Sequence, residues 1–151
     1  MAYMHKEIFE IFFEVYDAVT PDAYFFVDDL IALPIQALNR KGYTTAFCCA
    51  GHPFTRQFED EIVPCSDPIE YNREYNKMQC QSYISFSEGV TFLPEIPRGF
   101  YKDTGASGYN LVIRKDYEYD GSDVYGIMHV IVDTMKQLYE WTLSLPDYSR
   151  L

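Results

Sequence analysis

A chain of 151 residues, of which 48% are apolar and 17% aromatic, can bury a core of its own, which excludes an intrinsically disordered protein. Its formal charge of −11 repels nucleic acids and anionic membranes, so we expect neither as a direct partner. No stretch approaches the ~20 apolar residues of a membrane span, no signal peptide is evident, and four cysteines are too few for a disulfide scaffold. These features predict one cytoplasmic domain spanning residues 1–151, with reduced thiols.

The N-terminal segment carries apolar residues at helical spacing. Residues 3–19 are therefore predicted to form a helix, with acidic residues on the opposite side. Pro21 ends this helix, and the apolar run 23–27 that follows is either a short strand or an extended link. The predicted apolar stripe consists of Met4, Ile8, Ile11, Phe12, Val15 and Val19.

Residues 27–52 predict a helix, a strand and a tight turn in succession. Asp28 or Asp29 can cap the helix, and Gly42 can take the left-handed position after its end. Pro34 lies inside this stretch, so the helix is kinked there or begins close to it. Residues 43–49 favour a strand, which ends at the turn Ala50–Gly51–His52. The apolar face of the helix consists of Leu30, Leu33, Ile35 and Leu38.

The sequence from residue 52 to residue 115 predicts one helix and two strands separated by loops. Residues 52–66 are expected to form a loop, followed by a helix that begins at the capping Asp67 and Pro68 and runs to about residue 78. Strands are predicted over 81–87 and 110–115. Prolines and glycines make 88–109 a long loop, with at most one short strand near 90–93.

The C-terminal third predicts an acidic turn and a long helix. Residues 116–123 form the turn, Ser122 or Asp123 caps the helix, and Pro146 stops it. The whole pattern favours an α+β, two-layer fold in which a three- to four-stranded sheet is covered by the N- and C-terminal helices. One helix face gathers Val124, Ile127, Met128, Ile131, Met135, Leu138 and Trp141 or Thr142.

Cys49 and His52 are separated by two residues at the junction of a strand and a turn. With Cys65 and Cys80 they could form a closed tetrahedral zinc site, although only one short-spaced ligand pair is present. Cys49 and His52 could instead be a nucleophile and its base, or simply a free cysteine and a histidine that stabilises a turn. A disulfide between Cys48 and Cys49 is disfavoured by a reducing compartment. We predict neither a metal nor a cofactor.

Strand alternation bears on which of these side chains can reach a ligand. If Cys48 faces the core, Cys49 lies on the opposite side of the sheet, where a pocket with Thr45 and His52 can bind a ligand. Arg98 and Arg114 are the cations best placed to contact an anion bound in the same region. The glycine-rich segment 104–108 precedes a strand rather than a helix, so it predicts a hairpin loop and not a phosphate-binding loop.

An acidic, tyrosine-bearing segment follows the last predicted strand. Carboxylates beside amphipathic aromatic rings suit a face that binds an arginine- or lysine-rich partner, and an ordinary solvated loop accounts for the pattern equally well. The segment consists of Asp116, Tyr117, Glu118, Tyr119 and Asp120.

Two resemblances involve the region from Leu38 to His52. The string L-N-R-K-G-Y-T-T-A-F-C-C-A-G-H, with S-Y-I-S-F and L-P-E-I-P-R-G-F further on, resembles a family of small proteins of bacteriophages and Firmicutes that share an L-N-x-K-G-Y-x-T-x-x-[SC]-C-x-G-H core and have no established activity. Part of it is similar to the T-x-S-C-S-G-R motif of the tRNA wybutosine-synthesis methyltransferase family, which implies S-adenosylmethionine and a tRNA substrate. His52 stands where that family has arginine, and Phe47 and Cys48 replace serines. The matching residues are Asn39, Tyr43, Thr45, Cys49 and Gly51.

Charge, aromatic content and resemblance together favour a non-enzymatic binding protein, borne by a phage or mobile element. We expect it to dock its acidic, tyrosine-rich face on a basic host protein, as an inhibitor of a nucleic-acid-binding or defence protein. The alternative is a pocket around Thr45, Cys49 and His52 that sequesters or modifies a nucleotide-like ligand. The sequence leaves enzymatic activity and a homo-oligomer open.

Overall fold

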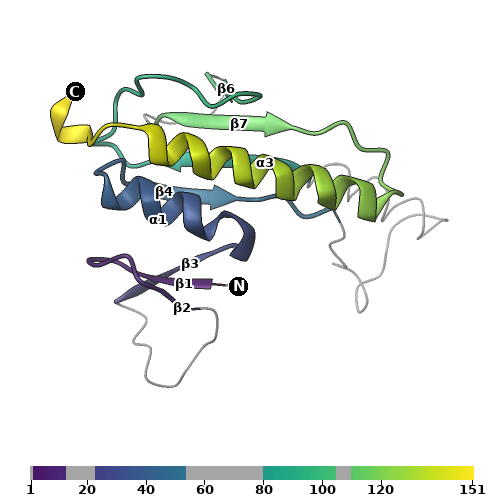
Figure 1. Ribbon diagram of the computed structural model, residues 1–151, viewed down its shortest axis with the longest axis horizontal. Helices are drawn as coiled ribbons and strands as arrows, with labels where there is room; N and C mark the ends of the chain where they lie inside the picture. Colours follow the sequence, from purple (N-terminus) through teal and green to yellow (C-terminus); the bar gives the residue numbers. More distant parts are fainter. Residues whose placement is uncertain (1, 13–22, 54–79, 105–109) are drawn as a thin grey trace.

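A computed structural model describes residues 2–12, 23–53, 80–104 and 110–151, and in this part of the chain the fold is α+β (Figure 1). The larger sheet is antiparallel and has the strand order β4 (Thr45–Cys49), β5 (Gln81–Phe86), β7 (Val112–Asp116), β6 (Tyr101–Lys102). A smaller antiparallel sheet has the order β2 (Ile11–Phe12), β1 (Ala2–His5), β3 (Tyr24–Val27). The α-helices are α1 (Ala32–Arg40) and α3 (Val124–Ser144).

The predicted N-terminal helix over residues 3–19 is wrong wherever the structure describes it, and residues 13–19 lie outside the described part. Strand β1 pairs with both β2 and β3, and cross-strand aromatic contacts join the strands. The rings of Tyr3 and Phe26 are 4.7 Å apart, and those of Phe12 and Tyr24 are 5.4 Å apart. Aromatic residues favour paired strands, and this tertiary pairing outweighs the helical spacing of the apolar residues.

The predicted helix after residue 28 is confirmed, and its proline lies where a helix tolerates one. A short 3-10 turn, η1 (Asp29–Ile31), leads into α1, so Pro34 stands in the first turn of α1, where N–H groups lack helical partners. Gly42 follows the helix with a φ of +90°, and its N–H donates to the carbonyl of Asn39. This conformation favours glycine, as predicted.

The predicted strands over 43–49, 81–87 and 110–115 are confirmed as β4, β5 and β7. Cys48 lies opposite Ile84 and packs against the core, whereas Cys49 lies opposite Tyr83 on the other face of the sheet. Alternation therefore separates the two cysteines as expected. In the long loop, residues 90–93 form no strand, and the short strand is β6 instead.

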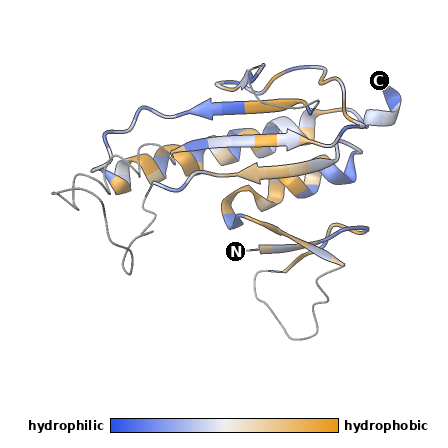
Figure 2. Ribbon diagram, turned by 180° about the vertical axis from the view of Figure 1, so that it is seen from behind, coloured by the Kyte–Doolittle hydropathy of each residue, from blue (hydrophilic) through white to orange (hydrophobic). Residues whose placement is uncertain are grey.

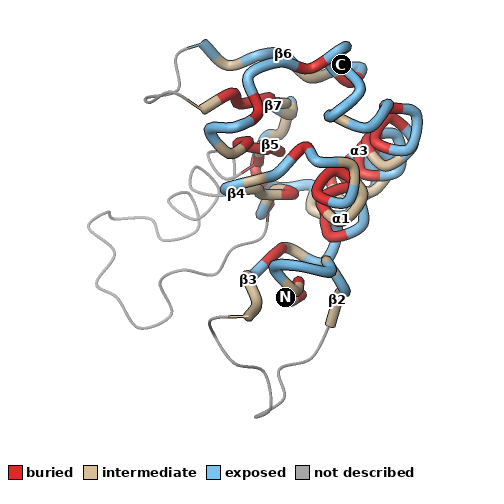
Figure 3. The backbone as a smooth tube through the Cα atoms, turned by 90° about the vertical axis from the view of Figure 1, so that its left-hand side faces the viewer, coloured by how far each residue is buried: buried red, intermediate tan, exposed pale blue. Residues whose placement is uncertain are grey.

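Helices α1 and α3 lie side by side over one face of the larger sheet, while its other face turns away from them (Figures 1 and 3). Buried residues from both sheets and both helices form one core. Strand β7 passes from hydrophobic to hydrophilic residues as it approaches the acidic segment (Figure 2). Among the described residues, no helix has the length and apolarity needed to cross a membrane. The largest fully buried side chains include Tyr43, Phe86, Met4, Ile31, Ile35, Leu38, Ile84 and Ile131.

Hydrogen bonds join the C-terminal end of α1 to the C-terminal end of α3. The Nζ of Lys41 donates to the carbonyl oxygens of Leu143, at 2.8 Å, and Leu145. The hydroxyl of Tyr43 donates to the Pro146 carbonyl at 2.7 Å. A cation at the C-terminus of α3 satisfies carbonyls that have no helical partner and complements the helix dipole. Helix α3 ends two residues before Pro146, as predicted.

Candidate functional site

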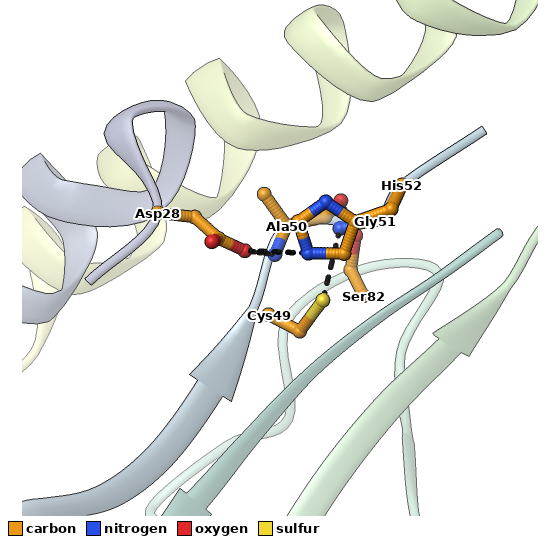
Figure 4. Close-up of polar contacts among 6 residues, drawn as sticks. All are labelled: Asp28, Cys49, Ala50, Gly51, His52 and Ser82. Carbon is orange, nitrogen blue, oxygen red and sulfur yellow. Dashed lines mark hydrogen bonds and ion pairs between the residues drawn. The ribbon is translucent and has the colours of Figure 1, made fainter. Parts of the chain in front are cut away.

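Three side chains with different chemistry converge at the end of β4. Asp28 follows β3, Cys49 is the last residue of β4, and His52 lies in the turn beyond it (Figure 4). The Nε2 of His52 is 3.4 Å from Oδ2 of Asp28, and one ligand atom from each of the three residues lies within 4.8 Å of the others. Figure 4 shows the Cys49 sulfur and the Asp28 carboxylate approaching the same edge of the imidazole ring.

The carboxylate of Asp28 can take part in this cluster because it does not cap the helix that follows. Its backbone holds the N-cap position of η1, but its carboxylate makes no capping hydrogen bond. Instead, Oδ2 accepts a hydrogen bond from the N–H of Ala50 at 3.0 Å. The sequence indicated only a capping role for Asp28, since nothing in the local pattern shows that β3 and β4 end close together. The cluster therefore contains an acid that sequence analysis missed.

The conformation of the turn that carries His52 is set by Gly51 and by backbone hydrogen bonds. Gly51 has a φ of +111°, and a Cβ there would lie 3.4 Å from both the carbonyl oxygen of Gln81 and Cδ1 of Ile131. The conformation therefore favours glycine, and an added Cβ would be in van der Waals contact with both neighbours. The N–H of Gly51 points at the Sγ of Cys49, 3.4 Å away, and the Ala50 carbonyl accepts from the Ser82 hydroxyl at 2.7 Å.

The close contacts shift the ionisation of His52 and Asp28 in opposite directions. Hydrogen bonds to Asp28, and then to Cys49, raise the pKa of His52 to about 10. Burial pushes the pKa of Asp28 upward, but the bonds from His52 and from the Ala50 N–H outweigh it and leave that pKa below its ordinary value. At neutral pH the two groups form an imidazolium–carboxylate pair. A histidine in this state is already protonated, which disfavours the role of a general base for Cys49.

Of the other described cysteines, Cys80 is buried and Cys48 is half-buried. Burial raises the pKa of Cys48 to about 12 and that of Cys80 to about 11. Both are free, as is Cys49, so no disulfide joins Cys48 to its neighbour. Cys80 lies in the core and is not part of the cluster at the end of β4, and Cys65 lies outside the described residues. Of the four residues that could form a zinc site, the structure thus brings together Cys49 and His52.

A cavity of about 310 Å³ opens beside the cluster. The His52 side chain is 46% exposed, so the imidazole borders this cavity and also reaches the half-buried Asp28. The cavity is lined by Asp28, Asp29, Leu30, Ala50, Gly51, His52 and Met128.

The other predicted ligand-binding residues lie elsewhere. Thr45 begins β4, at the opposite end of the strand from Cys49, and its hydroxyl accepts from the Asn39 side chain at 3.0 Å. The guanidinium of Arg114 donates to Asp103 at 2.8 Å and to Gln81 at 2.6 Å.

Arg98 borders a separate cavity of about 600 Å³ near the C-terminal half of α3, together with Trp141. The five predicted ligand-binding residues therefore divide among separate places, and only Cys49 and His52 meet.

In the predicted partner-binding segment, acids and tyrosines point in different directions. Asp116, Glu118 and Asp120 are exposed. Tyr117 and Tyr119 pack against the core, where the Tyr117 hydroxyl is 2.7 Å from that of Ser82 and the Tyr119 hydroxyl donates to the Pro53 carbonyl at 3.1 Å. The outer face of this segment is thus acidic rather than aromatic.

A groove of about 550 Å³ runs between this segment and the first turns of α3, and we call it the acidic groove. Tyr125 on α3 is 85% exposed, but it is not among the residues that line the groove, whose aromatic member is Tyr119. The residues that line the acidic groove are Glu118, Tyr119, Asp120, Asp123, Gly126, Ile127 and Val130.

No protein-family model, no curated protein and no solved structure matches this chain. The two resemblances in the Leu38–His52 region therefore stay predictions. So do the loop over 52–66 beyond residue 53, the helix over 67–78, and the glycine-rich hairpin loop over 104–108 beyond residue 104, which lie outside the described residues.

Proposed function

We propose that this protein is a non-enzymatic binding protein that holds a lysine- or arginine-rich segment of a partner protein in its acidic groove. The observation that carries the proposal is the composition of the groove. Three carboxylates, from Glu118, Asp120 and Asp123, border a surface to which Ile127 and Val130 contribute apolar atoms. Lysine and arginine side chains have an apolar stem and a cationic end, so one side chain can contact both.

The charge of the whole chain supports the same partner. A net charge of −11 accelerates the approach of a basic protein, and Tyr119 contributes an aromatic ring to the lining of the groove. The basic partner would be a host nucleic-acid-binding or defence protein that a phage- or mobile-element-borne inhibitor occupies. Such proteins bind phosphate through basic surfaces, and an acidic groove competes for those surfaces.

The test places positive charge inside the groove and compares it with a matched change elsewhere. Glu118→Lys with Val130→Lys reverses one carboxylate and adds a cation at a position that is 46% exposed. Glu88→Lys with Leu143→Lys makes the same two kinds of change at exposed positions outside the groove. Both double variants change the net charge equally. Binding of a fluorescent peptide rich in lysine and arginine is then measured by anisotropy at low and moderate salt.

The expected result is a loss of binding in the groove variant, with near wild-type binding in the matched variant. Affinity should also fall steeply with added salt, because the contacts lie at the surface. Equal binding by the two variants would show that only the net charge matters, and the acidic groove would then have no role of its own.

A second candidate function is favoured by the cavity beside His52. Its volume of about 310 Å³ lies near the lower limit of about 300 Å³ for small-molecule sites. An imidazolium at its edge suits an anionic, nucleotide-like ligand, which the protein would sequester or modify. Equilibrium dialysis against nucleotides with wild type and His52→Ala tests this function. Affinity for an enclosed ligand should change little with salt, unlike affinity for the basic peptide.

A further inference from the structure

We propose that Asp28, Cys49 and His52 bind a divalent transition-metal ion, best matched by Zn²⁺, with a fourth coordination position open to the adjacent cavity. The site is separate from the acidic groove and does not depend on it. It also replaces our sequence-based expectation that the protein holds no metal. The argument rests on the ligand chemistry, the distances, the backbone that holds the ligands, and the cavity beside them.

The ligand chemistry points to a particular class of ion. A thiolate, an imidazole and a carboxylate are the three side-chain types that bind Zn²⁺ in proteins. Ca²⁺ and Mg²⁺ prefer oxygen ligands, so Cys49 disfavours both. Among the described residues, this is the single group of three or more such side chains whose ligand atoms converge.

The distance between the nitrogen and oxygen ligands matches a tetrahedral site. Zinc lies about 2.0 Å from nitrogen and oxygen ligands and about 2.3 Å from sulfur, so tetrahedral nitrogen and oxygen ligands are about 3.3 Å apart. The Nε2 of His52 and Oδ2 of Asp28 are 3.4 Å apart, and an ion bound there would displace the proton that Nε2 carries in the ion-free pair. One ligand atom from each of Cys49, Asp28 and His52 lies within 4.8 Å of the others, so the sulfur moves closer to complete the site. A nucleophile–base–acid arrangement requires the thiol and the acid on different ring nitrogens, whereas here both approach one edge (Figure 4).

The surrounding backbone orients two of these ligands before any ion binds. The Ala50 N–H donates to the Asp28 carboxylate, and the Gly51 N–H points at the Cys49 sulfur. Ser82 fixes the carbonyl of Ala50 from the neighbouring strand β5. Hydrogen bonds of this kind hold metal ligands in position and tune their basicity.

Three protein ligands beside a cavity leave room for a fourth ligand from solution. Structural zinc sites are closed by four side chains, whereas sites that bind water or a small molecule keep one position open. The cavity of about 310 Å³ is bordered by Asp28 and His52 themselves, and by Leu30 and Met128 on its apolar side. The open position would therefore take water or a small anionic ligand.

The experiment uses the full chain, stripped with a chelator and then titrated with Co²⁺ and Zn²⁺. Cobalt reports the ligands directly, since a thiolate ligand gives a sulfur-to-cobalt charge-transfer band and a tetrahedral site gives intense visible bands. Wild type should bind one ion per chain. Zinc affinity is measured by competition with a chromogenic chelator, and zinc should also protect Cys49 from alkylation, as read by peptide mapping.

Cys49→Ala is the principal variant, and Cys48→Ala is its matched control on the other face of the same strand. Loss of a direct ligand should weaken zinc binding by about 100-fold or more, since even outer-shell changes cost about 10- to 100-fold. The charge-transfer band should disappear in Cys49→Ala and persist in Cys48→Ala. His52→Ala is a second variant, chosen because this partly exposed side chain can be removed with little effect on folding.

Two results would overturn the proposal. One is wild-type protein that takes up no stoichiometric zinc or gives a cobalt spectrum without a charge-transfer band. The other is equal zinc affinity in Cys49→Ala and Cys48→Ala, both shown to be folded by circular dichroism.

Discussion

Carboxylates occur in two contrasting settings in this molecule. At the end of β4, Asp28 is half-buried and its oxygen meets a histidine and a backbone N–H. In the acidic groove, Glu118 and Asp120 face solvent. Charges that are half-buried and hydrogen-bonded act over short distances and resist salt, whereas exposed charges act through their summed field and are screened. The first setting suits recognition of a small, defined ligand, and the second suits the capture of a basic surface.

The largest expected effect tests the rigidity of the turn at the end of β4. Gly51→Ala forces a side chain into a conformation that favours glycine, against the Gln81 carbonyl and Ile131. We expect a loss of about 1–3 kcal/mol in the free energy of unfolding, measured by urea denaturation. Gly89→Ala is the control, since a Cβ there would have no neighbour within 4 Å. Similar losses in both variants would mean that the turn is not specially constrained.

A loss in the same range is expected when the half-buried carboxylate is removed. Asp28→Ala leaves the N–H of Ala50, a buried residue, without its acceptor, which costs about 1–3 kcal/mol in the metal-free protein. Asp28→Asn keeps an oxygen acceptor for that N–H, so its loss should be clearly smaller. Urea denaturation of both variants, with chelator present, measures the difference. If Asn destabilises as much as Ala, the charge opposite His52 matters more than the hydrogen bond.

The pH dependence of the metal-free protein should report the pair of His52 and Asp28. A histidine whose pKa is raised by folding stabilises the protein fully below its unfolded pKa near 6.5, and this contribution is lost as pH rises through about 10. The difference in unfolding free energy between wild type and His52→Gln should therefore shrink across this range. Because the ring is 46% exposed, solvent screening keeps the effect modest. A difference that stays constant with pH would contradict the pairing.

The smallest effect on stability is expected in the acidic groove. Glu118→Gln should change the free energy of unfolding by less than about 1 kcal/mol, because exposed charges contribute little individually. Thermal unfolding of this variant and of wild type, at low and high salt, provides the measurement. A larger destabilisation would indicate that Glu118 holds the fold together, and the two carboxylate settings would then differ less than we infer.

Much of the fold could be predicted from local pattern. Helix α1, its end at Gly42, strand β4 and helix α3 all follow from capping residues, proline positions and alternation. The N-terminal strands could not, because the apolar residues there recur at helical spacing, while β1 and β2 have only four and two residues, too few to show the alternation of a strand. There the outcome depends on a partner strand, Tyr24–Val27, that local pattern does not identify.

The candidate site was predictable in part for the same reason. Cys49 and His52 are close in sequence, so spacing and the glycine between them indicated a site. Asp28 lies more than twenty residues earlier, and its role depends on how β3 and β4 end relative to each other. Conversely, the segment 116–120 has its acids where they were expected, but packing against the core turns Tyr117 and Tyr119 inward. Sequence spacing does not show which side of an irregular segment is buried.

The hydrogen bonds that join the C-terminal end of α1 to that of α3 have a consequence for folding kinetics. Lys41 and Tyr43 reach carbonyl groups that are 102 to 104 residues away along the chain. Joining such distant segments costs loop entropy before any bond compensates for it, so contacts of this kind tend to form late. We expect the two ends to join after the transition state. Their bonds would then act mainly by slowing unfolding. The protein would therefore stay folded partly because the kinetic barrier to unfolding is high, and not only because the folded state is more stable at equilibrium.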